Sequence, residues 1–473
     1  MQRYQTKIAG VPQEIRKIHV VQSPFDGSTV GEVGLLSELD AERVCDSVAR
    51  GFQATKQLAT HERARLLDEV ARVLEARVEE ISTLIARESG KPIRYARAEV
   101  RRAATTFTLA SAEARRFGGE TLPIDQQPGQ EGRLCSYRRV PKGPLLAISP
   151  FNFPLNLAAH KVAPALAVGA SVLLKPPQQT PLTAHVLADI VHQAGAPTGA
   201  FELAHCEPDI ADRLVADPRF KVLSFTGSDA LGFRLKRAAE KKSVLLELGG
   251  NAPCIVDEGV DIGACMPRFI ESAWANAGQI CIKAQRFFVH EALFDSFLEA
   301  FVAASTAVKV GDPLDEKTVV GPLIEARHRE RVLSWIEEAR AGGARVLCGA
   351  SAEGTCVLPT VLTGTTPGMR VCADEVFGPV TVVEKFSKFR DGLSLANSGR
   401  FGLQASVFTP RVDHALAAYD ALDFGAVLIN EVTSFRVDNY PYGGVKDSGL
   451  GREGVRYAME ELSEPKVLIL RAE

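Results

Sequence analysis

Residues 143–175 read GPLLAISPFNFPLNLAAHKVAPALAVGASVLLK. In this segment two short apolar stretches flank a longer stretch that is rich in small residues. We predict strands at Leu145–Ser149 and Ser171–Lys175 on either side of a helix near Leu157–Val168. A further helix is predicted at Leu182–Gln193. Such alternation favours an α/β fold with a parallel sheet, in which ligands bind at the carboxyl ends of the strands.

The flanking segments extend this pattern in both directions. Residues 11–36 predict short strands and residues 40–117 predict helices. A second α/β run follows from about Glu247 to Asn430. The Gly/Pro/Gln-rich residues 118–140 lead into an alternating strand at 134–140. A last apolar strand is predicted at Val467–Leu470. The sequence leaves its pairing partner undecided between the 134–140 strand and another subunit. The predicted strands that carry the α/β pattern onward lie at 222–225, 254–256, 287–290, 381–386 and 426–430.

Composition restricts the class of protein. The chain has 473 residues, enough for two or three domains, with 46% hydrophobic and 24% charged residues. A net charge of −3 argues against nucleic acid or an anionic membrane as a partner. Nine cysteines without a Cys-x-x-Cys pair, and no apolar leader at the N-terminus, predict reduced thiols and a cytoplasmic protein. The nine histidines lack metal-binding spacing, so no metal site is predicted.

Cys281 is the candidate nucleophile, in the segment NAGQICIKAQR (residues 276–286). The alternative is a buried core cysteine, since apolar flanks raise the pKa of a thiol and leave it inert. Two other residues favour the nucleophile: Glu247, in LELGGN, and Asn152, in PFNFPLN. A thiol, a carboxylate and an amide can serve thioester chemistry as nucleophile, base for water and oxyanion donor.

Two segments at predicted strand ends are candidates for binding a phosphate. They are LLKPP (173–177) and SFTGS (224–228), and the second opens a helix whose free N–H groups favour anions. Thr226 and Ser228 also suit simple N-caps. The run GLGREG (449–454) matches the dinucleotide pattern G-x-G-x-x-G, but no βαβ unit can follow it. We therefore predict a turn that leads into a helix.

Several separated motifs together resemble the aldehyde dehydrogenase superfamily over nearly the whole chain. They are Pro150–Pro154, Lys175–Pro177, Phe225–Ser228, Glu247–Asn251, Gly278–Cys281, Glu375–Pro379 and Pro441–Lys446. The resemblance implies a Rossmann-like coenzyme domain (1–120 and 140–247), an α/β catalytic domain (248–445) and a small β oligomerisation element (121–139 and 446–473). It also implies a homodimer or homotetramer.

The mechanism implied by the resemblance is the NAD(P)-dependent oxidation of an aldehyde to its acid. Cys281 would attack the carbonyl to give a thiohemiacetal, and Asn152 with the Cys281 backbone N–H would hold the oxyanion. Hydride transfer would leave a thioester. Glu247 would then activate water, and its presence favours hydrolysis, because family members that transfer the acyl group to coenzyme A lack it.

Cofactor contacts are likewise carried over from the family's motifs. Lys175 is similar to the adenosine-ribose contact, Ser228 to a pyrophosphate contact and Glu375 to the nicotinamide-ribose contact. Gln178 departs from the Glu of many NAD-preferring members, so NAD is the first choice and NADP stays open. The expected cofactor-binding residues are Ser149, Pro150, Phe151, Lys175, Gln178, Thr226, Gly227, Ser228, Leu248, Gly249, Glu375 and Phe377.

The substrate side is similar to the branch of lactaldehyde, non-phosphorylating glyceraldehyde-3-phosphate and phosphonoacetaldehyde dehydrogenases. Members that take phosphorylated aldehydes tend to carry Arg before the nucleophile, where this chain has Ile280, so a small polar aldehyde is expected. Arg436 has two interpretations, a salt bridge with Asp438 or a neighbour and a clamp for a polar substrate group. A semialdehyde dehydrogenase with Arg436 on the distal carboxylate, and a catalytically silent homologue, are the alternatives. The expected aldehyde-lining residues are Phe153, His160, Ile280, Ile282, Phe435, Arg436 and Tyr442.

Overall fold

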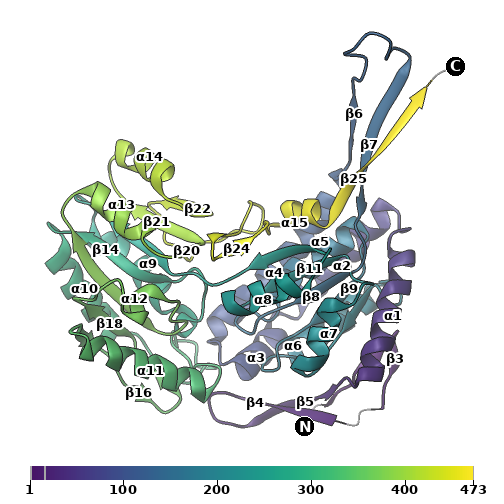
Figure 1. The fold of residues 1–473 in the computed structure, drawn as a ribbon. Helices are drawn as coiled ribbons and strands as arrows, with labels where there is room; N and C mark the ends of the chain where they lie inside the picture. The colour runs from purple at the N-terminus through teal and green to yellow at the C-terminus, as the bar shows by residue number, and fades with distance from the viewer. Residues whose placement is uncertain (1–2, 15–16, 472–473) are drawn as a thin grey trace.

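The computed structural model describes residues 3–14 and 17–471. Two lobes, each built on one large sheet, lie side by side, and a three-stranded arm rises from the first lobe (Figure 1). This arrangement agrees with the expected α/β class and the expected small β element.

The first lobe surrounds a six-stranded sheet of order β10-β9-β8-β11-β12-β24. All neighbours in it pair in parallel except β24, which lies antiparallel to β12. Every predicted strand in this part of the chain is present. The strands are β8 (Leu145–Ile148), β9 (Val172–Lys175), β10 (Phe201–Leu203), β11 (Val222–Thr226), β12 (Ser243–Glu247) and β24 (Gly449–Leu450).

Helices cover both faces of this sheet, as an all-buried parallel sheet requires. Along β8, Leu145 and Ala147 pack into one core cluster, while Leu146 and Ile148 pack into another on the opposite face. The first cluster includes residues of α2 (Thr60–Ala76), α3 (Val78–Ser89), α4 (Ile93–Arg116), α5 (Asn156–Val168), α6 (Leu182–Gln193) and α15 (Val455–Glu461). The second includes α1 (Glu38–Thr55), α7 (Pro208–Ala216) and α8 (Asp229–Ala238).

The second lobe surrounds a seven-stranded sheet of order β15-β18-β19-β14-β13-β21-β22, in which β15 is the antiparallel member. An aromatic cluster of Phe269, Phe287, Phe297 and Phe408 fills its core at ring distances of 4.7–5.7 Å. The strands are β13 (Ala252–Val256), β14 (Ala284–His290), β15 (Arg345–Cys348), β18 (Thr360–Thr363), β19 (Val380–Phe386), β21 (Gln404–Phe408) and β22 (Ala426–Ile429). The helices are α9 (Ile262–Trp274), η1 (Ala275–Gly278), α10 (Phe294–Thr306), α11 (Ala326–Ala341), α12 (Arg370–Ala373), α13 (Phe389–Asn397) and α14 (Val412–Ala421).

Small sheets complete the fold. A three-stranded sheet near the N-terminus has the order β1-β5-β4, and three two-stranded sheets lie elsewhere. Their strands are β1 (Arg3–Tyr4), β2 (Lys7–Ile8), β3 (Val11–Pro12), β4 (Lys17–Gln22), β5 (Thr29–Leu35), β16 (Ala352–Glu353), β17 (Cys356–Val357), β20 (Phe401–Gly402) and β23 (Val445–Lys446).

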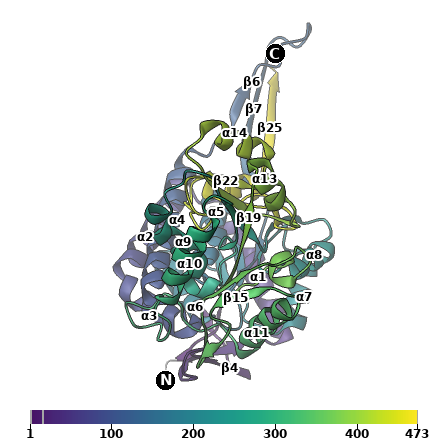
Figure 2. The same cartoon turned by 90° about the vertical axis from the view of Figure 1, so that its left-hand side faces the viewer.

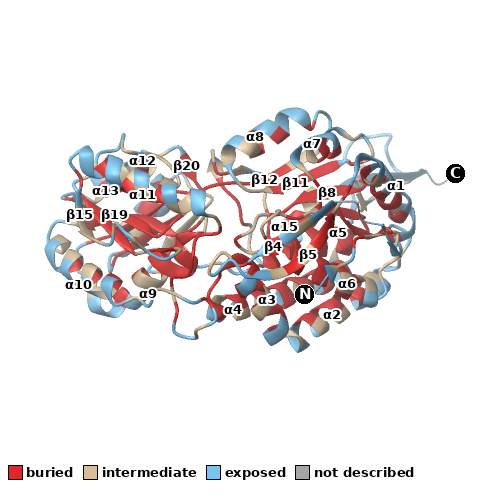
Figure 3. Ribbon diagram, turned by 90° about the horizontal axis from the view of Figure 1, so that it is seen from below, coloured by how far each residue is buried: buried red, intermediate tan, exposed pale blue. Residues whose placement is uncertain are grey.

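The arm decides between the two partners left open for the C-terminal strand. β25 (Ser463–Arg471) pairs antiparallel with β7 (Arg133–Pro141), and β6 (Glu120–Leu122) pairs with the other edge of β7. The arm projects away from both lobes (Figure 2), and its surface is largely exposed (Figure 3). Val467–Leu470 on β25 are 51–59% exposed, so an apolar strip lies open to solvent.

The segment 446–462 differs from the expected division of the chain, which placed it in the oligomerisation element. β24 extends the first-lobe sheet, and α15 packs in the first-lobe core on α5. The run 449–454 therefore forms an edge strand and a turn before α15, in line with the predicted turn and helix. The other expected domain boundaries remain predictions.

Within the described ranges, none of the helices is long and apolar enough to cross a membrane. All nine cysteines are free thiols. The same ranges contain no cluster of three metal-ligating side chains.

Candidate functional site

A cavity of about 760 Å³ lies between the two lobes, at the carboxyl ends of β8, β9, β11 and β12. The three expected catalytic residues, Cys281, Glu247 and Asn152, line it. So do all twelve residues expected to bind the cofactor. Since parallel strands present their carboxyl ends at one edge, residues from four separate motifs come together there.

Polar atoms without protein partners face this cavity. Ser149 Oγ, Thr226 Oγ1 and Glu247 Oε2 are buried and have no hydrogen-bond partner among the described residues. Buried polar groups normally have partners, so these three atoms fit a ligand with several polar groups, such as a dinucleotide. Ser228, the N-cap of the ten-residue helix α8, makes no side-chain capping bond. The predicted simple N-cap role is therefore not what its hydroxyl does.

Close backbone approach also shapes the cofactor side. A Cβ on Gly249 would lie 2.7 Å from Glu375 Oε2, and a Cβ on Gly227 would lie 2.5 Å from the Phe225 ring. Glu375 Oε1 accepts a hydrogen bond from the Gly250 N–H at 3.0 Å. Burial raises the pKa of Glu375 to about 7. The carboxylate is thus fixed at the point where the two lobes meet.

At the far end of the cavity, Gln178 is held by neighbours from other elements. Its side-chain Nε2 donates to Glu207 Oε2 at 3.2 Å, and its backbone carbonyl oxygen lies 2.8 Å from His19 Nε2. Lys17 Nζ lies 2.6 Å from Glu207 Oε1. Position 178 is neutral, but Glu207 supplies a carboxylate beside it. Glu207 was not among the residues predicted from the sequence.

Cys281, the candidate nucleophile, follows a strained turn. Asn276 and Ala277 have φ of 52° and 54°, and Gly278 has φ of +68°. A Cβ on Gly278 would lie 2.3 Å from the Gly378 carbonyl oxygen, so only glycine fits there. Burial raises the pKa of the Cys281 thiol to about 12, although its hydrogen bond with Tyr442 lowers it. The sulfur needs help from its neighbours to ionise.

Asn152 is anchored beside the nucleophile segment. Its Nδ2 donates to the Gln279 carbonyl oxygen at 2.9 Å, two residues before Cys281. Gln279 is itself fixed, because its Oε1 accepts from the Ile324 N–H at 3.0 Å. The amide is therefore held at a defined place next to the sulfur-bearing segment.

Glu247 ends β12 and is buried next to a second carboxylate, Glu453. Burial and the Glu453 charge raise the pKa of Glu247 well above its ordinary value. Burial also opposes ionisation of Glu453, but Lys161, His160 and Arg436 lower the pKa of Glu453 to about 2. The Lys161 ammonium lies 3.1 Å from Glu453. The environment therefore moves the pKa values of the two carboxyls apart, raising that of Glu247 and lowering that of Glu453, a common way to tune an acid–base group.

None of the seven residues expected to line the aldehyde site lines the large cavity. Ile282 and Tyr442 are buried and pack in one cluster with Ile280 and Cys281. Phe153 lies under the Lys91 ammonium at 3.6 Å from its ring centre, and Phe435 is exposed. Which of these side chains touch an aldehyde stays a prediction.

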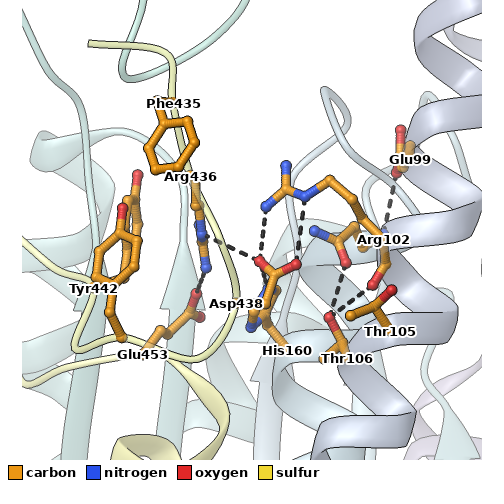
Figure 4. Close-up of polar contacts among 12 residues, drawn as sticks. Glu99, Arg102, Thr105, Thr106, His160, Phe435, Arg436, Asp438, Tyr442 and Glu453 are labelled. Carbon is orange, nitrogen blue, oxygen red and sulfur yellow. Dashed lines mark hydrogen bonds and ion pairs between the residues drawn. The ribbon is translucent and has the colours of Figure 1, made fainter. Parts of the chain in front are cut away.

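Arg436 makes the salt bridges that were one of its two interpretations. Its Nη2 lies 3.3 Å from Glu453 Oε2 and its Nε lies 3.6 Å from Asp438 Oδ1. Asp438 also holds Arg102 at 2.7 Å and His160 at 2.9 Å (Figure 4). Arg102 lies on α4, and its charge reaches across the chain to Asp438.

Lys161, Glu453 and Glu207 lay outside the sequence-based prediction. Only Lys161 carries a visible signal, a lysine inside the almost wholly apolar helix α5, where an unpaired charge would be costly. Glu453 lies in the glycine-rich run before α15, and nothing in that run indicates its partners. Their contacts depend on the packing of distant segments.

Comparison with known proteins agrees with this geometry. The model of the family described as "Aldehyde dehydrogenase family" matches residues 11–468. A 3-sulfolactaldehyde dehydrogenase of Priestia aryabhattai is 36% identical over 451 residues, or 95% of this chain and 94% of that protein.

Two solved structures are also similar. Aldehyde dehydrogenase 21 from Physcomitrella patens, in complex with the reaction product succinate, matches with a TM-score of 0.97 at 39% identity, over 99% of this chain and 98% of that one. The glyceraldehyde-3-phosphate dehydrogenase GapN of Methanocaldococcus jannaschii, complexed with NADP, matches with a TM-score of 0.93 at 36% identity, over 97% and 100%. The expected family and branch are confirmed.

Proposed function

The chain belongs to the aldehyde dehydrogenase family and is an NAD(P)-dependent aldehyde dehydrogenase, and from this premise we propose the residues that carry its reaction. One observation carries the proposal. Cys281, Glu247 and Asn152 come from three separate segments, yet all three line the cavity that the twelve cofactor residues line. The substrate is a small polar aldehyde and the product its carboxylic acid.

The catalytic cycle begins at the Cys281 sulfur, which attacks the aldehyde carbon. The Asn152 amide and the Cys281 backbone N–H hold the oxyanion of the thiohemiacetal; losing one such donor typically costs about a hundredfold in rate. NAD(P), held by the cofactor residues of the cavity, would supply the hydride acceptor beside this carbon. A thioester to Cys281 results.

Glu247 completes the cycle as the base for water. Its Oε2 has no partner among the described residues, so a water molecule can hydrogen-bond to it. The water proton passes to the ionised carboxylate, the hydroxyl attacks the thioester carbon, and the acid leaves as the sulfur is freed. Glu453, Lys161 and Arg436 surround Glu247 with fixed charges that set its ionisation.

For the cofactor, Lys175 and Gln178 bind the adenosine ribose, Ser228 the pyrophosphate and Glu375 the nicotinamide ribose. The Glu207 carboxylate, held 3.2 Å from the Gln178 amide, restores negative charge beside the neutral residue 178. A 2′-phosphate would meet that charge, which favours NAD over NADP. Lys17 offsets part of the charge at 2.6 Å, so the preference is moderate.

For the substrate, a hydroxylated or singly charged aldehyde fits best. Ile280 offers no second cation beside the sulfur, and Arg436 is already paired with Glu453 and Asp438. The semialdehyde alternative needs Arg436 free for a distal carboxylate, so it is not favoured. A silent homologue is not favoured either, because the nucleophile, base and amide all line one cavity.

Two features support the proposed assembly and location. The apolar strip Val467–Leu470 on β25 is exposed, and Leu122 and Leu134 on the same arm are also exposed. A strip of this kind on an edge strand suits pairing between copies, which supports a homodimer or homotetramer. Nine free thiols fit a reducing cytoplasm.

The test measures, by absorbance, the reduction of NAD and, in separate assays, of NADP. The panel comprises lactaldehyde, 3-sulfolactaldehyde, succinate semialdehyde and an unsubstituted aldehyde. We expect the highest kcat/KM with a hydroxylated or sulfonated aldehyde, and no turnover of any aldehyde by Cys281→Ala. Equal rates with the unsubstituted aldehyde would contradict the substrate proposal, and unchanged turnover in Cys281→Ala would contradict the nucleophile.

A further inference from the structure

Tyr442 places a hydroxyl against the nucleophile. Its Oη lies 3.6 Å from Cys281 Sγ, and the residue is only 3% exposed. Its backbone is fixed by two hydrogen bonds with Glu453, at 2.9 Å and 2.7 Å. The hydroxyl therefore stands at a set place beside the sulfur.

Apolar side chains also pack against Cys281. Ile280, Ile282 and Leu403 pack around Cys281 and Tyr442. In the part of the chain that the structure describes, no other hydrogen bond reaches Sγ. An apolar pocket disfavours a thiolate, and burial accordingly raises the pKa of Cys281, while the Tyr442 hydroxyl lowers it.

Arg436 strengthens this hydroxyl as a donor. Its guanidinium lies 3.6 Å from the centre of the Tyr442 ring, on the ring face (Figure 4). A cation over a phenol ring draws electron density from it and makes the O–H a better donor. Glu453 keeps Arg436 in place from the other side. The buried cation thus acts on the sulfur through the phenol.

We propose that Tyr442 is a catalytic residue, whose hydroxyl donates a hydrogen bond to the Cys281 thiolate and so sustains the ionised nucleophile in an apolar site. This role goes beyond the expected one of lining the aldehyde site. It rests on the proposed assignment of Cys281 as the nucleophile. As the sulfur attacks the aldehyde, negative charge moves to the new oxyanion and the hydrogen bond to sulfur weakens.

The test is the pH dependence of Cys281 alkylation by iodoacetamide in Tyr442→Phe. We expect the midpoint to rise by about one pH unit, so alkylation near neutrality falls about tenfold and recovers at alkaline pH. Because the chain has nine cysteines, the modified peptide is identified by mass spectrometry, with Cys281→Ala as the blank. A wild-type midpoint in Tyr442→Phe would overturn the proposal.

Tyr440→Phe is the matched control. Its hydroxyl donates to Gln404 Oε1 at 3.0 Å, and its ring lies 6.3 Å from that of Tyr442. We expect the wild-type midpoint in this variant, and an equal shift in both would also overturn the proposal. Alkylation needs no aldehyde, so absence of turnover with every aldehyde would contradict the proposed function without deciding this inference.

Discussion

The cofactor side and the substrate side of the cleft differ in how their polar groups are satisfied. On the cofactor side, Ser149 and Thr226 have buried hydroxyls without a hydrogen-bond partner among the residues that the structure describes. On the substrate side, Arg436, Asp438 and Glu453 are held together in ion pairs. Unpartnered polar groups at strand ends are available to bind a ligand. Paired charges instead fix one another's position and shift the pKa values of neighbouring groups.

The two sides also differ in where their residues come from. The cofactor side is made by consecutive strand ends in the first lobe, with Glu375 and Phe377 added from the second. The substrate side joins α4, α5 and the last fifth of the chain; Arg102 and Asp438 are 336 positions apart. Changes on one side should therefore alter ligand binding, while changes on the other should alter stability and proton transfer. The predictions below test this contrast.

The largest effect is expected where the two sides meet. Cys281→Ala removes the nucleophile, and turnover should fall by roughly 10⁴-fold or more. Cofactor binding should persist, because the cofactor side is intact. Cofactor titration and steady-state assays measure the two separately. Cys348→Ala, a half-buried thiol in β15, is the control and should keep full activity; loss of activity there would show a general sensitivity to cysteine removal.

Glu247→Gln separates acylation from hydrolysis. The variant keeps its shape but cannot accept a proton from water, so kcat should fall by about 10²- to 10³-fold. A rapid burst of reduced cofactor, one per site, should remain in stopped-flow traces, because thioester formation does not need this base. Loss of the burst together with turnover would place Glu247 in the first half-reaction instead.

Lys161→Met tests the substrate-side network through stability. It removes one partner of a buried pair, and the free energy of unfolding should fall by about 3–5 kcal/mol. Urea unfolding followed by fluorescence measures this. Arg72→Met breaks an exposed pair with Glu69 and should leave the unfolding free energy nearly unchanged. Equal losses in the two variants would remove the distinction between buried and surface pairs.

The pH dependence of hydrolysis should follow Glu247. Burial and the Glu453 charge raise the pKa of Glu247, so its base form appears at higher pH than that of an ordinary glutamate and grows as pH rises through that pKa. Where hydrolysis limits the rate, kcat should increase up to about tenfold per pH unit below that pKa. Glu453→Gln should move the rise to lower pH, since it removes a like charge. An unchanged profile in Glu453→Gln would contradict the coupling.

The smallest effect is expected on the cofactor side. Glu207→Gln removes the charge beside Gln178, and kcat/KM with NADP relative to NAD should rise about fivefold, because one such charge contributes about 1 kcal/mol in water. Stability should be nearly unchanged, unlike the Lys161 variant. Glu38→Gln, a surface carboxylate of the same lobe paired with Arg213, is the control. A ratio that does not move would exclude Glu207 as the discriminating charge.

The sequence predicted the architecture, and the twelve residues that it proposed for the cofactor lie together along one cavity. Strand positions such as 145–149 and 222–225 were readable, because parallel strands buried on both faces are short apolar runs. The motif residues Lys175, Thr226 and Glu247 end such strands, and strand ends of one parallel sheet meet at one edge. The packing of residues 446–462 against the first lobe was not predicted from the sequence, since a two-residue edge strand and a short helix carry too little periodicity.

The sequence by itself determined the fold class and supplied the candidates for the nucleophile, the base and the dinucleotide edge, because each depends on local motifs and on one simple rule of sheet topology. Only the tertiary structure decided which charges surround Glu247, that Glu207 stands beside Gln178, and that the Tyr442 hydroxyl reaches the Cys281 sulfur. The physical reason is that these contacts join segments tens to hundreds of positions apart. Their strength depends on burial and distance, which no local pattern of residues encodes.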